Sequence, residues 1–149
     1  MTQEEKDLLF KDLCARIPYS LIVACTDDDG TMPNVWEVVY INNFKDAYLL
    51  NTESTATQLI SIEEVKPFLF PMSSMTDEQR KEFIQCAGYE VREEENGYHY
   101  ETYYYDLVGH GDNMFTDADG LDWLNKNHFD FRGLIEKGLA IDATNLNIY

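Results

Sequence analysis

The sequence has few basic residues for its length. Only 11 of its 149 residues are Lys or Arg, against 28 Asp or Glu, so the formal net charge is −17. A protein that binds nucleic acid without specificity needs cations against the phosphates, and anionic membrane surfaces attract cationic proteins for the same reason. The charge therefore excludes the first class and disfavours the second, and we expect no direct binding to nucleic acid or to membranes.

Cysteines and long apolar runs are also scarce. The three cysteines, Cys14, Cys25 and Cys86, are odd in number, widely spaced and without a CxxC pair. A disulfide framework or a thiolate zinc site needs closer or paired spacings, so we expect free, buried or half-buried thiols in a cytoplasmic protein. No stretch approaches the ~20 apolar residues that span a bilayer, and the first residues lack the pattern of a secretory signal.

The common catalytic and cofactor motifs are missing as well. The sequence has no GxSxG motif and no glycine-rich phosphate loop, and its three histidines lack an HxH or HExxH spacing. Asp117 and Asp119 resemble part of a calcium loop, but the ligand positions at its two ends would be Phe115 and Lys126. We therefore expect no cofactor and no metal, and the pattern favours a non-enzymatic protein without excluding an enzyme.

What the sequence does contain is typical of a folded domain. Hydrophobic residues make up 44% of the chain and aromatic residues 13%, which excludes a disordered chain. We predict one α+β domain over residues 1–149. Thr2 and Glu5 fit a capping box that starts a helix over residues 3–16, and Thr76 and Gln79 fit a second one. Apolar and β-branched runs predict strands over residues 20–26, 35–41, 47–50 and 58–62.

These strands are joined by short turns, which predicts an antiparallel, strongly bent sheet that is barrel-like in its most curved form. Two prolines within residues 66–75 favour an extended or single-turn course there. We predict C-terminal helices over residues 121–127 and 131–137 that cover one side of the sheet. Asp130 would cap the second helix and Gly138 would end it. Residues 139–141 would form a last edge strand.

Three segments together, Lys11–Tyr19, Lys66–Thr76 and Asp122–Ala140, carry a resemblance. The chain resembles an uncharacterised protein family common in gut Bacteroidales genomes, prophages and mobile elements. The resemblance covers roughly 40 residues in the right order, and the last segment is the most specific. The family has no established activity, so the resemblance implies a phage or mobile-element context and no chemistry.

Residues 89–108 are unusually acidic and rich in tyrosine. They contain six tyrosines, and Asn96-Gly97 is the strongest short signal for a hairpin turn. Acids and tyrosines on alternating strand positions would imitate a phosphate backbone or meet a basic groove; the alternative is a solvated hairpin that keeps the chain soluble. The predicted partner-binding face comprises Glu93, Glu94, Glu95, Tyr98, Tyr100, Glu101, Tyr103 and Tyr105.

A second candidate lies near the C-terminus, where Asn125, His128 and Arg132 would expose a small polar recognition patch. The alternative is structural, with His128 as a helix C-terminal residue that the helix dipole favours and Arg132 paired to Asp130 or Asp122. We expect an acidic accessory protein of phage or mobile-element type that binds a host protein, either as a nucleic-acid mimic or as another inhibitor. The alternatives are a small enzyme that uses His110 or His128 with nearby carboxylates, and a self-associating structural component of a phage particle.

Overall fold

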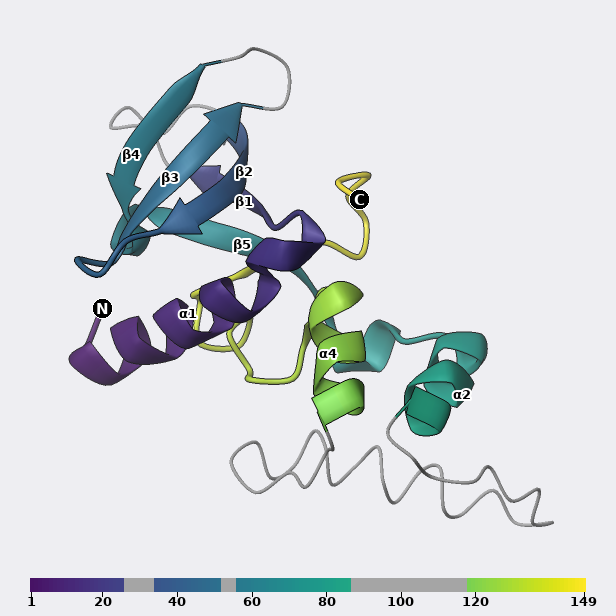
Figure 1. Cartoon of the computed structure of the whole chain (residues 1–149). Helices are drawn as coiled ribbons and strands as arrows, with labels where there is room; N and C mark the ends of the chain where they lie inside the picture. The colour runs from purple at the N-terminus through teal and green to yellow at the C-terminus, as the bar shows by residue number, and fades with distance from the viewer. Residues whose placement is uncertain (26–33, 52–55, 87–117) are drawn as a thin grey trace, which may run out of the picture.

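A computed structural model describes residues 1–25, 34–51, 56–86 and 118–149 of the chain (Figure 1). Over these ranges the chain forms three α-helices, one of them at the N-terminus, and seven strands, which confirms the predicted α+β class. The predicted turn at residues 27–30 and the predicted hairpin at residues 89–108 lie outside the described residues.

Helix α1 spans Gln3–Arg16, as predicted. The Thr2 hydroxyl accepts a hydrogen bond from the Glu5 amide at 3.2 Å, and the Glu5 carboxylate accepts one from the Thr2 amide at 2.6 Å. This reciprocal pair is the expected capping box. The helix passes into a 3-10 turn at Ile17–Tyr19, because Pro18 lacks the amide that would continue it.

The strands form one mixed sheet in the order β4-β3-β2-β1-β5-β6, with β7 also paired to β5. The pairs formed among strands β1 to β5 are all antiparallel, but β6 and β7 run parallel to β5. The prediction of a purely antiparallel sheet is therefore wrong, because the C-terminal strands return to β5 after long crossovers. The described strands do not close into a barrel, and the strong bend stays a prediction. The strands are β1 (Ile22–Cys25), β2 (Asn34–Ile41), β3 (Asp46–Asn51), β4 (Thr57–Ser61), β5 (Val65–Pro71), β6 (Phe129–Asp130) and β7 (Ile141–Asp142).

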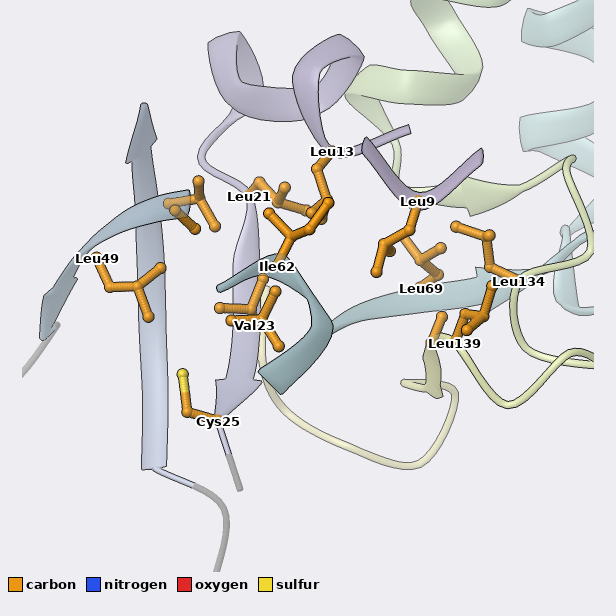
Figure 2. Close-up of a cluster of buried hydrophobic side chains, with 14 residues drawn as sticks. Leu9, Leu13, Leu21, Val23, Cys25, Leu49, Ile62, Leu69, Leu134 and Leu139 are labelled. Carbon is orange, nitrogen blue, oxygen red and sulfur yellow. The ribbon is translucent and has the colours of Figure 1, made fainter. Parts of the chain in front are cut away.

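The main core lies between α1 and one face of the sheet, which we call the inner face (Figure 2). Along β3, Ala47 and Leu49 are fully buried on this face, whereas Tyr48 and Leu50 point to the opposite, outer face and are only half-buried. This alternation is the two-residue period of a strand with one covered side. Other fully buried members of this core are Leu9, Leu13, Leu21, Val23, Ile62, Leu69 and Leu134.

A second core joins helices α2 (Asp77–Cys86) and α4 (Ala118–Lys126). The rings of Phe83 and Trp123 lie 5.6 Å apart, and Trp123 stacks on Phe129 at 5.7 Å and 7°. Helix α2 begins with the predicted second capping box, in which Thr76 and Gln79 exchange backbone-to-side-chain hydrogen bonds.

The predicted helix over residues 131–137 is wrong, because this segment forms turns. Gly133, inside the predicted helix, has a φ of +69°, in the left-handed region where a right-handed helix cannot continue. Gly138 has a φ of +71°, the left-handed conformation expected of the residue that ends the segment. Asp130 still caps the segment as expected, because its carboxylate accepts hydrogen bonds from the amides of Leu134 at 2.9 Å and Ile135 at 2.8 Å.

The segment after β7 covers part of the outer face of the sheet. Ala143 is fully buried there and Ile148 packs beside it, against side chains of β1 and β5 that alternate with the main core. The Ala143 amide donates to the Leu69 carbonyl at 2.9 Å, which fixes this segment to β5. The outer face of the sheet thus has a covered half, at β1 and β5.

The three cysteines are free thiols, as expected, but only Cys25 is buried; Cys14 and Cys86 are exposed. None of the described helices has the length and apolar character needed to cross a membrane.

Candidate functional site

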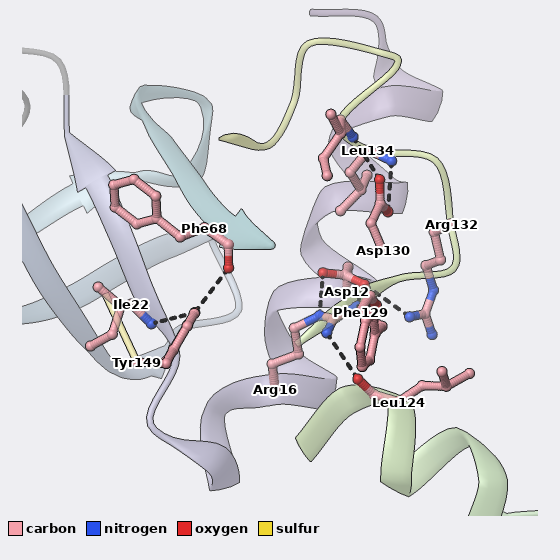
Figure 3. Close-up of polar contacts among 11 residues, drawn as sticks. Asp12, Arg16, Ile22, Phe68, Leu124, Phe129, Asp130, Arg132, Leu134 and Tyr149 are labelled. Atoms are coloured by element: carbon pink, nitrogen blue, oxygen red, sulfur yellow. Dashed lines mark hydrogen bonds and ion pairs between the residues drawn. The ribbon is translucent and has the colours of Figure 1, made fainter. Parts of the chain in front are cut away.

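Two charged residues of α1 lie on the buried side of the helix. Asp12 and Arg16 are one turn apart and both are 0% exposed. Arg16 Nε donates to one Asp12 carboxylate oxygen at 2.8 Å and an Arg16 terminal nitrogen donates to the other at 3.0 Å (Figure 3). This two-pronged pairing is the strongest geometry for an arginine and a carboxylate.

Arg16 also reaches the C-terminal part of the chain. It donates to the Phe129 carbonyl at 2.8 Å and, at 3.5 Å, to the Leu124 carbonyl near the end of α4 (Figure 3). The last carbonyls of a helix lack partners within the helix, so a cation at this end satisfies them. Arg16 therefore holds α4 and β6 against α1.

Arg132 completes the group from the turn after β6. It donates to Asp12 at 2.9 Å, and its guanidinium lies 4.2 Å from the centre of the Phe131 ring. Burial lowers the pKa of Arg132, and the Asp12 carboxylate opposes that shift. We call Asp12, Arg16 and Arg132 the Asp12 cluster. The prediction that Arg132 pairs with Asp130 or Asp122 is wrong, because the folded chain brings Asp12 to it and Asp130 caps the following turn.

His128 lies next to this cluster, directly after α4. Its φ of +57° is the left-handed conformation that commonly ends a helix. The ring is buried and stacks on Tyr149 with a centroid distance of 3.9 Å and an angle of 11°. Burial and the nearby Arg16 lower the pKa of His128 to about 4. His128 thus lies at the C-terminal end of α4, as the structural interpretation expects, but its ring is neutral at pH 7, so the helix dipole stabilises no charge there.

Tyr149 fixes the C-terminal segment to the sheet. Its hydroxyl donates to the Phe68 carbonyl at 2.9 Å and accepts from the Ile22 amide at 3.4 Å (Figure 3). Burial raises the pKa of Tyr149, so the hydroxyl stays protonated. The His128–Tyr149 stack thus joins the end of α4 to β1 and β5.

The predicted exposed patch of Asn125, His128 and Arg132 is not found. Asn125 and His128 are 7% and 5% exposed, and Arg132 is half-buried against Asp12. Arg132 is turned toward the buried Asp12 carboxylate of α1, and the His128 ring is covered by Tyr149. Within the described ranges, Asn125 Oδ1 and His128 Nδ1 have no hydrogen-bond partner.

The chemistry of the Asp12 cluster is structural. The Asp12 carboxylate accepts three hydrogen bonds from two guanidinium groups and has no exposed surface, so it is not placed to contact a substrate. Among residues 1–25, 34–51, 56–86 and 118–149, no group of three His, Cys, Asp or Glu side chains is arranged to hold a metal ion.

The residues of the predicted partner-binding face, from Glu93 to Tyr105, lie outside the described residues, as does His110. Their charge is nevertheless informative. Residues 87–117, which we call the acidic segment, contain eight acids and one Arg. The described residues hold 16 of the 28 acids and 10 of the 11 bases, so they carry only −6 of the net charge of −17.

Sequence reasoning missed Asp12, Arg16 and Tyr149. A signal for the first two was present: positions 9, 12, 13 and 16 share one side of a helix, so a charged pair four residues apart falls among leucines. Nothing in the sequence pairs Arg16 with the carbonyls of residues 124 and 129, because that contact exists only once α4 is packed.

Comparisons with protein-family models, with curated proteins and with solved structures give no match for this chain.

Proposed function

We propose that this chain is a cytoplasmic, non-enzymatic accessory protein of phage or mobile-element type that binds a basic host protein through its acidic segment. The observation that carries the proposal is the uneven distribution of charge. The acidic segment has a formal charge of −7 over 31 residues, whereas the described residues carry −6 over more than three times that length.

The described residues on either side of the segment support this function. The segment follows α2 and precedes α4 in the chain, and these two helices pack on each other through Phe83 and Trp123. The residues that flank the segment therefore belong to one packed helix pair (Figure 1). A dense negative charge attracts a basic partner over long range and accelerates association, with strong dependence on salt.

Two forms of this function stay open. In the first, the segment is a nucleic-acid mimic that occupies the groove in which the partner binds phosphates. In the second, the tyrosines contribute most of the contact, since tyrosine is enriched in protein interfaces. Competition with duplex DNA separates them, because only the mimic shares its site with the phosphates.

The alternative of a small histidine enzyme has less support. His128 is neutral at pH 7 but buried beneath Tyr149, and Asp12, the fully buried carboxylate of the adjacent cluster, is engaged by two arginines. A general base must come within hydrogen-bond reach of a substrate proton, and neither group is accessible for that contact.

The test is capture of proteins from a host lysate on the immobilised chain, followed by titration of the purified captured protein. We expect binding at low salt that falls steeply as salt rises, and a large loss of affinity in the variant Glu93→Gln/Glu94→Gln/Glu95→Gln. The matched control is Glu64→Gln/Glu82→Gln/Glu136→Gln, which removes the same charge from exposed positions of the described frame. Binding that is equal at low and high salt, or equally weakened by both triple variants, would contradict the proposal.

A further inference from the structure

An apolar row crosses the outer face of the sheet away from the half that the C-terminal segment covers. Tyr40 of β2 is paired with Tyr48 of β3, which is paired with Leu59 of β4. Tyr40 is 50% exposed and Leu59 55%, and the two tyrosine rings stack at 5.2 Å and 14°. We call these three residues the Tyr40 strip. It runs from the middle of the sheet to its edge.

Strand β4 forms that edge. It is the first strand in the sheet order, and among the described residues it pairs only with β3. Residues 56–62 contain no charge and no proline. Natural proteins usually protect an edge strand with charges, proline or a bulge, because its free amides and carbonyls pair with any strand that approaches. An uncharged edge rich in β-forming residues lacks that protection.

We propose that β4 pairs antiparallel with β4 of a second copy of this chain, across a two-fold axis at Leu59. In this register Leu59 faces Leu59 of the other copy, and the two Tyr40 strips join into one row of six side chains on the outer face. Close cross-strand apolar pairs are the unit by which sheets are stabilised. A two-fold contact of this kind uses the same patch on both copies, so it closes at a dimer.

Charge favours a second copy as the occupant over a basic protein. A basic partner gains nothing from β4, which offers it no carboxylate. Two copies of a chain with a charge of −17 repel each other over most of their surface, and an uncharged edge is where they approach at least cost. The inference goes beyond the proposed function and does not depend on it.

The contact is small, with five residues in β4 and three apolar side chains from each copy. Interfaces of this size are weak, so we expect a dimer that forms in the micromolar to millimolar range. Salt screens the repulsion between the two acidic copies, so the dimer should become tighter as salt rises. Binding to a basic partner has the opposite dependence, so failure of one proposal is distinguishable from failure of the other.

The experiment is sedimentation equilibrium of the full chain at several protein concentrations, at low and high salt. We expect a monomer–dimer equilibrium that shifts toward dimer at high salt. Hydrogen exchange of the amides in residues 57–61 should become slower as the fraction of dimer increases. The variant Leu59→Glu places like charges opposite each other at the two-fold axis and should be monomeric throughout. Because the Leu59 side chain is more than half exposed, the thermal unfolding of Leu59→Glu should match that of the wild type.

The matched control is Leu146→Glu, which adds the same charge at a residue that is 44% exposed in the C-terminal segment. It should dimerise like the wild type. A wild-type chain that stays monomeric into the millimolar range at high salt would overturn the proposal. So would equal loss of the dimer in both variants, or a dimer in which the amides of β4 exchange at the monomer's rate.

Discussion

Two regions of this molecule depart in opposite ways from the usual distribution of polar and apolar residues. The Asp12 cluster holds two fully buried charged side chains of α1 and one half-buried charged side chain, and the Tyr40 strip leaves three large apolar side chains at the outer face of the sheet. The buried charges find their partners within the chain, at distances of 2.8–3.0 Å for the ion pairs. The strip is covered by no such internal partner among the described residues, and we infer that its partner is external.

The two regions differ in where their side chains find partners, and this difference indicates where function resides. A buried charge with complete hydrogen bonding is explained by the fold that it stabilises. An exposed apolar row on an uncharged strand edge, or a segment with eight acids and one base, is not explained by the stability of the chain that carries it. The predictions below test the two sides of this comparison.

The largest effect should come from Asp12→Asn. It leaves the buried guanidinium of Arg16 and the half-buried guanidinium of Arg132 without their carboxylate, and breaking a buried ion pair in this way costs about 3–5 kcal/mol. The measurement is the free energy of unfolding by chemical denaturation. Asp7→Asn removes an exposed carboxylate from the same helix and should change stability far less, because exposed ion pairs are weak. An equal loss of unfolding free energy in the two variants would show that the Asp12 cluster does not stabilise the fold.

A second effect should appear as a pH dependence from His128. Its pKa is about 4 in the folded chain against an ordinary value of 6.5, so the unfolded chain takes up the proton first as the pH falls. The stability that the neutral ring contributes is complete above pH 6.5 and is lost between pH 6.5 and 4, by about 3 kcal/mol in total.

The variant His128→Asn isolates this effect, since Asn tolerates the left-handed conformation and does not titrate. The difference in unfolding free energy between wild type and variant should shrink by about 3 kcal/mol from pH 7.5 to pH 4. The carboxylates of the acidic surface titrate in both proteins and cancel in the difference. If this difference in unfolding free energy stayed constant with pH, the prediction would be wrong, because the His128 ring would then be solvated in the folded chain.

A smaller effect should follow from Tyr149→Phe. It removes the hydroxyl that bonds to Phe68 and Ile22 but keeps the stack on His128, and a net hydrogen bond is worth about 1 kcal/mol. The measurement is again the free energy of unfolding. Tyr40→Phe is the control, because it removes a hydroxyl from a residue that is half exposed. It should leave the free energy of unfolding almost unchanged, since the Tyr40 side chain is half in solvent.

The smallest effect on monomer stability should come from the strip itself. Leu59→Ser should change the free energy of unfolding by about 0.5 kcal/mol or less, because the side chain is 55% exposed. Leu49→Ala, on the inner face of the neighbouring strand, should cost about 2–5 kcal/mol. Thermal unfolding at low protein concentration measures both. A large loss in Leu59→Ser would show that the chain itself covers this residue.

The elements that could be predicted from the sequence are those with local causes. Capping boxes at Thr2 and Thr76 depend on residues three positions apart, and the four strands from β1 to β4 follow from β-branched and apolar runs. The capping residue Asp130 and the apolar spacing after it predict a helix over residues 131–137. Gly133 in the left-handed conformation interrupts it, and a glycine in a sequence is compatible with either conformation.

The candidate site could not be predicted in the same way, because its contacts are long-range. Asp12 meets Arg132 across 120 positions of the chain, and Tyr149 meets Ile22 across 127. The predicted exposed patch of Asn125, His128 and Arg132 is wrong for the same reason. Arg132 meets a carboxylate and His128 meets a tyrosine ring from opposite ends of the chain, and no local pattern identifies either partner.

The most direct test of the central claim, that function resides in the acidic segment and the buried polar residues are structural, is the salt dependence of binding to the captured partner. For the wild type and for Glu64→Gln/Glu82→Gln/Glu136→Gln, the logarithm of the affinity should fall with the same steep slope against the logarithm of salt concentration. For Glu93→Gln/Glu94→Gln/Glu95→Gln the affinity should be lower and the slope shallower. Three identical slopes with identical affinities would contradict the account.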